Sequence, residues 1–101
     1  MGTASYICKG TEIALQKSFG SSVHGAGRAM SRTAAIKSYR GTEIQKELFQ
    51  KGIESKATHP KVLAEEAPSA YKDIENVIES IHGVGISLKV ARVEPIGVLK
   101  G

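Results

Sequence analysis

The clearest pattern of apolar positions in this chain has the period of an α-helix. Four branched residues, Ile74, Val77, Ile78 and Ile81, stand at i, i+3, i+4 and i+7, which places them on one face of a helix. Gly83 follows them as a residue typical of a helix end. We therefore expect an amphipathic helix here that packs its apolar face against the rest of the chain.

Shorter apolar runs have the length and the flanking residues of strands. They cover residues 4–8, 53–57, 87–93 and 96–99. The last two runs are separated by Pro95, which cannot donate a hydrogen bond to a β-ladder. The strands therefore alternate with helices, and we predict an α/β fold of mixed strands and helices that forms a single unit over residues 1–101.

Three more helices are expected, two of them from their capping residues. Thr11 precedes a helix over residues 12–19, and a second helix is expected from Ser31 to Ser38. Thr42 and Gln45 have the spacing of a capping box, which opens a third helix that stops at Gly52. Glycines and serines punctuate residues 20–28, so that we predict a loop there.

Composition narrows the class of protein. The chain has 101 residues, of which 41% are hydrophobic and 5% aromatic, as expected for one folded domain with an aliphatic core. Its single cysteine, Cys8, cannot form an internal disulfide and fits a reducing compartment. The sequence contains no signal peptide pattern and no apolar run of membrane-spanning length. We therefore predict a soluble, cytoplasmic protein with no membrane partner.

The net charge of +4 is unevenly distributed. Residues 13–42 contain no acid, whereas residues 62–81 contain five acids and one lysine. A basic segment of this kind attracts phosphates, but it is also compatible with a solvated face that the acidic segment balances. The basic residues of the first segment are Lys17, Arg28, Arg32, Lys37 and Arg40.

The loop that contains His24 is the candidate for chemistry. Gly25 and Gly27 allow a phosphate to approach the backbone closely, and a predicted helix N-terminus follows. Arg28 and Arg32, one helical turn apart, could form a clamp for an anion. A neutral imidazole in this setting is a possible nucleophile toward phosphorus. However, a single loop histidine is more often a surface or packing residue, and the glycines do not form a Walker motif.

The motif HGAGR-x-MSR, preceded by SFGSS, resembles the C-terminal part of the RtcB family of RNA-splicing ligases. The segments MGTASYI, LAEEAPSAYKDI and PIGVLKG resemble further blocks of that family, in the same order. The likeness runs along the whole chain, so that it is more specific than any single glycine motif. It implies the C-terminal part of an RtcB-like fold.

The resemblance also implies an activity and a site. The histidine of the HGAGR block, here His24, accepts GMP from GTP, and the guanylate passes to an RNA 3′-phosphate before a 5′-hydroxyl displaces it. Arg28 and Arg32 would contact RNA phosphate. By match of blocks, the residues that contact the nucleotide would be Met1, Ser5, His24, Gly25, Ala26, Gly27, Tyr71 and Lys100.

Family enzymes are several times longer and hold manganese through earlier segments. We therefore expect no metal ligand in this chain, and we interpret Cys8, His59 and His82 as structural. The implied partners are RNA (tRNA halves or broken RNA ends), an N-terminal ligase portion and the protein archease, and the fragment could form a homo-oligomer. We expect no activity from the 101 residues alone. The alternatives are a nucleotide- or RNA-binding module without chemistry and a structural remnant.

Overall fold

The computed structural model describes all residues, 1–101, and its contacts divide them into two compact units. The first unit comprises residues 1–3, 28–71 and 94–101, and the second comprises residues 4–27 and 72–93. Segments of the two units therefore alternate along the sequence. Each unit contains both strands and helices, which confirms the predicted α/β class.

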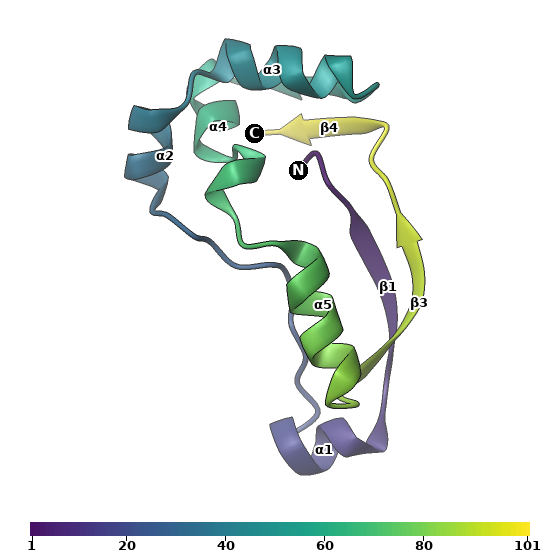
Figure 1. Cartoon of the computed structure of the whole chain (residues 1–101). Helices are drawn as coiled ribbons and strands as arrows, with labels where there is room; N and C mark the ends of the chain where they lie inside the picture. The colour runs from purple at the N-terminus through teal and green to yellow at the C-terminus, as the bar shows by residue number, and fades with distance from the viewer. The chain divides into compact units, whose positions relative to one another are not determined.

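The first unit contains three α-helices, a short 3₁₀ helix and a pair of parallel strands (Figure 1). The strand β2 pairs with β4 in a register that joins Glu54 to Gly97 and Ala57 to Lys100. The elements of this unit are α2 (Arg32–Ser38), α3 (Gly41–Gln50), β2 (Glu54–Ala57), α4 (Pro60–Glu65), η1 (Pro68–Ala70) and β4 (Gly97–Lys100).

The core of the first unit lies between α3, α4 and β2. Leu48 is the largest side chain that is fully buried, and it packs with the other buried members of an aliphatic cluster. Met1, Tyr39 and Val98 pack against this cluster from its margin. Burial of such side chains is the main stabilising contribution in a unit of this size. The buried members are Ile44, Leu48, Ile53, Leu63 and Ala67.

The close packing of α3 on α4 depends on a glycine. A Cβ atom added at Gly41 would lie 1.9 Å from the backbone oxygen of Pro60, so that only glycine fits at the first residue of α3. The predicted capping box is wrong, because Thr42 lies inside α3 and the N-cap is Arg40, which makes no capping bond. Gln45 instead donates from Nε2 to the Ser55 backbone oxygen at 3.1 Å, which joins α3 to β2.

The second unit is built on an antiparallel ribbon of β1 (Ser5–Gly10) and β3 (Ser87–Val93). The register shifts between Ile7 and Cys8, where the ladder is irregular. The helices α1 (Glu12–Ser18) and α5 (Ile74–Gly83) complete the unit, and α5 contacts β3 (Figure 1).

Local sequence signals account for both helices of the second unit. Thr11 caps α1 by accepting from the Ala14 backbone N–H, as predicted, and Phe19 ends the helix in the left-handed region with a φ of 53°. The predicted amphipathic helix is confirmed as α5, whose residue Ile78 is buried. None of the helices is long and apolar enough to cross a membrane.

Candidate functional site

The residues of the predicted site belong to both units. Arg28, Arg32, Tyr71 and Lys100 lie in the first unit together with Met1, whereas Ser5 and the loop over residues 24–27 lie in the second.

Arg28, in the first unit, reaches its position through backbone pairing. Arg28, the last residue of the predicted loop, forms an antiparallel bridge with Tyr71, and Ala29 donates its N–H to the Ala70 backbone oxygen at 2.8 Å. The short helix η1 turns the chain just before Tyr71, whose N–H donates to the Pro68 oxygen. Arg28 and Tyr71, distant in sequence, are therefore adjacent.

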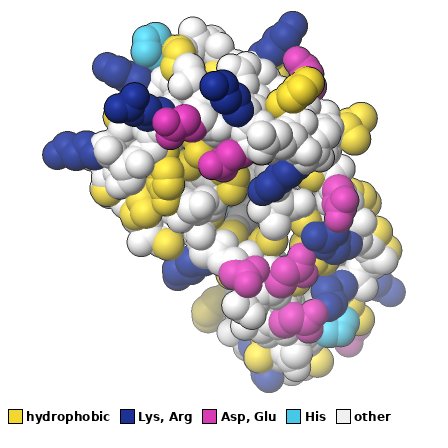
Figure 2. All heavy atoms as spheres, turned by 45° about the horizontal axis from the view of Figure 1, so that its top comes forward, with side chains coloured by type: hydrophobic (Ala, Val, Ile, Leu, Met, Phe, Trp, Pro, Cys, Tyr) yellow, Lys and Arg dark blue, Asp and Glu magenta, His cyan; other side chains and the backbone are white.

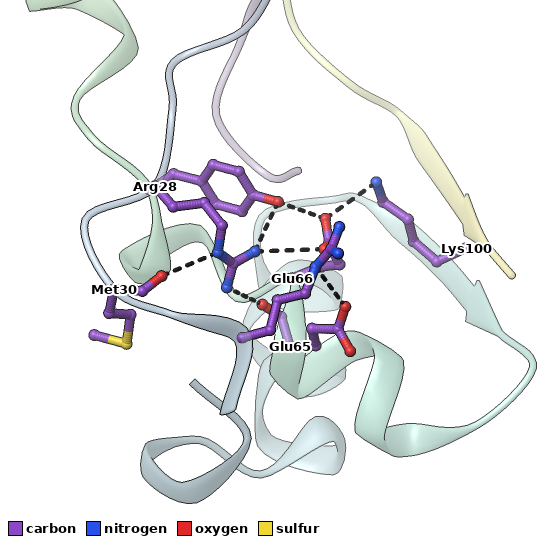
Figure 3. A network of polar contacts seen from close by, with 7 residues as sticks. Arg28, Met30, Glu65, Glu66 and Lys100 are labelled. Carbon is purple, nitrogen blue, oxygen red and sulfur yellow. Dashed lines mark hydrogen bonds and ion pairs between the residues drawn. The ribbon is translucent and has the colours of Figure 1, made fainter. Parts of the chain in front are cut away.

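The guanidinium of Arg28 donates hydrogen bonds to protein groups in several directions (Figure 3). Its Nε donates to the Met30 backbone oxygen at 3.0 Å and its Nη2 to that of Glu65 at 2.7 Å. Its Nη1 donates to the Tyr71 hydroxyl at 3.1 Å, and the guanidinium carbon lies 4.8 Å from the centre of the Tyr71 ring. Arg28 lies outside α2, so that Arg28 and Arg32 are not related by one turn of a helix, and a clamp formed by the two arginines stays a prediction.

Glu66, which follows the last residue of α4, is the centre of this network. Its carboxylate accepts from the Tyr71 hydroxyl at 2.6 Å, and it lies 3.5 Å from Arg28 Nη1 and 3.5 Å from Lys100 Nζ. Its side chain is only 15% exposed. Sequence reasoning missed this residue, although it lies in the LAEEAPSAYKDI block that drew attention to Tyr71. The signal that could have found Glu66 was the pair of adjacent acids, Glu65 and Glu66, in a chain whose basic segment contains no acid to pair with.

The electrostatics of the cluster keep Glu66 ionised. Burial raises the pKa of its carboxyl, but the Tyr71 hydrogen bond and the charges of Lys100 and Arg28 outweigh burial, so that the pKa lies below its ordinary value. Burial and the hydrogen bond to Glu66 raise the pKa of the Tyr71 phenol. The cluster is therefore a carboxylate held by one neutral and two cationic donors.

Arg32 pairs with the neighbouring acid. Its Nε lies 2.9 Å from the Glu65 carboxylate, and its side chain is 69% exposed, so that most of the guanidinium faces solvent. Two arginines of the basic segment, Arg28 and Arg32, therefore form ion pairs with acids of the acidic segment. Figure 2 shows basic and acidic side chains interspersed on one face of the molecule. These ion pairs favour the second interpretation of the charge pattern, in which the acidic segment balances the basic one.

In the second unit, His24 lies in an irregular loop with its side chain exposed and without a hydrogen-bond partner. Gly27 has a φ of 75°, a conformation that favours glycine, and its backbone oxygen accepts from the Lys72 N–H at 2.9 Å. The space beside Gly25 is open, because a Cβ atom there would meet no other atom within 4 Å. Ser5 is exposed on β1 opposite Val93. The loop therefore leaves its imidazole and one glycine face accessible.

The other histidines and the cysteine have separate structural positions. The Nδ1 of His59 accepts from the Lys61 N–H at the start of α4, and that of His82 accepts from the Lys89 N–H at 3.0 Å. Cys8 is exposed on β1. No group of three or more His, Cys, Asp or Glu side chains is arranged to hold a metal ion.

The chain is thus a mixed α/β protein with an exposed loop histidine that precedes a Gly-Ala-Gly run. It also has a separate cluster in which a carboxylate binds an arginine, a tyrosine and a lysine. A family model described as tRNA-splicing ligase RtcB matches residues 1–101. The chain belongs to the RtcB family.

Three relatives, each named tRNA-splicing ligase RtcB, match the whole chain. The protein from Methanococcus maripaludis is 57% identical over 101 residues, and those from Methanocaldococcus jannaschii and Pyrococcus horikoshii are each 54% identical over the same length. The matched region spans 21%, 10% and 12% of these relatives, respectively. The chain therefore corresponds to 21% or less of the length of each of these relatives.

Proposed function

We propose that this chain supplies the GMP-accepting histidine, His24, of a GTP-dependent RNA ligase that joins an RNA 3′-phosphate to a 5′-hydroxyl. The observation that carries the proposal is the exposed His24 in a glycine loop, within a chain that matches the RtcB family over residues 1–101. An accessible imidazole without a partner in the chain suits a nucleophile that has to reach phosphorus.

The proposed reaction consists of three displacements at phosphorus. An unprotonated nitrogen of His24 bonds to the α-phosphorus of GTP as the bond to the departing pyrophosphate breaks. An oxygen of the RNA 3′-phosphate then bonds to that phosphorus and releases His24. Finally the 5′-hydroxyl of the second RNA end attacks the 3′-phosphate phosphorus, gives up its proton and displaces GMP.

Positioning and charge neutralisation dominate catalysis of phosphoryl transfer. We assign the glycine loop, Ser5 and Met1 to nucleotide contact, with Lys100 as the cation and the ring of Tyr71 as a stacking surface. Manganese, held by segments of the longer family proteins, would neutralise the triphosphate. Because the chain has no metal-ligand cluster of its own, we expect it to depend on those segments.

The test is transfer of label from GTP that is radioactive at the α-phosphate. The chain is incubated with GTP and manganese, with and without the N-terminal portion of a family relative. We expect acid-labile, base-stable label only when that portion is present. The variant His24→Ala should abolish labelling, and the matched control His59→Ala should retain it. Label on His24→Ala, or none on the complemented wild type, would overturn the proposal.

RNA contact is assigned to Arg28 and Arg32 in different ways. Because Arg32 is exposed, we expect it to meet RNA phosphate directly, whereas Arg28 would act through the protein contacts that surround it. Binding through phosphate contacts weakens steeply with salt. Arg32→Ala should therefore lower RNA affinity and its salt dependence more than Lys51→Ala does, as measured by fluorescence anisotropy. Equal losses would indicate diffuse attraction.

A further inference from the structure

We propose that Glu66 is a positioning residue of the guanine nucleotide site, which holds Lys100 and Tyr71 in place through its carboxylate. The proposal rests on the proposed function, because that function assigns Lys100 and Tyr71 to the nucleotide. Glu66 itself would not touch the ligand. It would act through the two side chains that it binds.

The geometry of the first unit supports this role. Figure 3 shows Lys100, on β4, and the Arg28 guanidinium, from a segment outside the helices and strands, approaching the carboxylate of Glu66. Tyr71 donates to one oxygen of that carboxylate at 2.6 Å, and Lys100 Nζ lies 3.5 Å from the same oxygen. One largely covered carboxylate therefore contacts both side chains and constrains their positions.

The exposed fractions of the two side chains indicate that Glu66 holds Lys100 in place and not the reverse. The Glu66 side chain is 15% exposed, whereas that of Lys100 is 36% exposed. An exposed lysine has many rotamers, and a ligand that orders it loses affinity in doing so. Because the Glu66 carboxylate already restricts the rotamers of Lys100, less conformational entropy is lost when the ligand binds. The lysine ammonium has three donors, so that contact with Glu66 leaves others for a phosphate.

The role of Tyr71 follows from the same contacts. Its hydroxyl is engaged with Glu66 and Arg28, and Arg28 lies over its ring. The phenol is therefore fixed at its polar end, and the remaining ring face is left for a planar base. Arg28 in turn is fixed by backbone oxygens, so that the assembly is anchored to the fold.

The neighbouring acid provides a matched control. Glu65 lies next to Glu66 on α4, but its carboxylate pairs with Arg32, and only its backbone oxygen contacts Arg28. Glu65→Gln therefore removes a nearby charge of the same sign without touching Lys100 or Tyr71. Any loss of nucleotide binding that is specific to Glu66 will appear in the comparison of the two variants.

The experiment is a double-mutant cycle on GMP binding, measured with the chain complemented by the N-terminal portion of a family relative. We expect Glu66→Gln to weaken GMP binding about fivefold to tenfold, less than the loss of a direct charge-assisted contact, because Glu66 acts only through Lys100 and Tyr71. Lys100→Ala should have a similar or larger effect. The double variant should lose less than the sum of the two single losses, because only the effect of Glu66 on Tyr71 remains once Lys100 is removed. Glu65→Gln should stay within about twofold of wild type, since it leaves both side chains in place.

A second readout separates positioning from folding. At saturating GTP, Glu66→Gln should transfer label to His24 at the wild-type rate, so that KM rises while kcat is kept. If Glu66→Gln fails to fold, Glu66→Asp replaces it and should give a smaller loss. Additive losses in the cycle, or a fall in kcat alone, would overturn the role of Glu66. A wild type that does not bind GMP would overturn the proposed function as well.

Discussion

Arg28 uses the planar shape of its guanidinium to bind groups in several directions at once. Lysine has one compact ammonium and cannot reach the Met30 oxygen, the Glu65 oxygen and the Tyr71 hydroxyl together. We therefore expect Arg28→Lys to lower the free energy of unfolding by about 1.5–3 kcal/mol, as for hydrogen bonds that involve a charged group. Arg32→Lys, at an exposed pair, should change it by less than about 1 kcal/mol. Urea denaturation followed by circular dichroism measures both, and equal effects would contradict the prediction.

The lowered pKa of Glu66 predicts how the free energy of unfolding changes at acidic pH. Its pKa in the folded chain lies below the ordinary value of 4.5, so that the unfolded chain binds its proton more readily. The stabilisation is therefore present above pH 4.5 and is lost as the pH falls through the folded pKa. We expect wild type to lose more stability than Glu66→Gln upon acidification below this value. Denaturant midpoints over a pH series measure the difference, and parallel curves would contradict it.

At the scale of elements, the contact between α3 and α4 is the most sterically demanding feature. Gly41→Ala would place a methyl group 1.9 Å from the Pro60 backbone oxygen, so that one helix has to shift. Forced shifts in packed structures cost about 1–3 kcal/mol, and we expect a loss of at least this size. Gly97→Ala is the control in the same unit, because its Cβ would lie 3.7 Å from the Glu54 oxygen. Similar denaturation midpoints for the two variants would show that α3 and α4 separate easily.

At the scale of the whole molecule, exposed apolar side chains indicate surfaces that favour association with another chain. Phe19, Ile96 and Leu99 are 98%, 86% and 83% exposed, and both sheets have only two strands. Exposed apolar area and unpaired strand edges promote association. We expect a sedimentation coefficient that rises with concentration and falls when the N-terminal portion of a family relative is added. A monomer at all concentrations that unfolds cooperatively at high temperature would contradict this expectation.

The sequence by itself determined the elements that depend on neighbouring residues. The spacing of Ile74, Val77 and Ile78 predicted α5, and Thr11 predicted the start of α1, because periodicity and capping act within a few residues. The strand at residues 87–93 was also predicted with its observed bounds. Several motifs in a fixed order identified the family, which needs no knowledge of the fold.

Only the tertiary structure decided α4 and the environment of Arg28. Pro60–Glu65 is a six-residue helix without an amphipathic repeat, and burial of Leu63 and Ala64 stabilises it. Pro60 in its first turn was a local signal for its start, but too weak to predict the helix without that burial. From the sequence, Arg28 was interpreted as a cation available to an anionic ligand, because its partners Glu66 and Tyr71 lie 38 and 43 positions away. Their positions depend on the β-bridge and on the turn at η1, and contacts between distant segments form only when the chain packs.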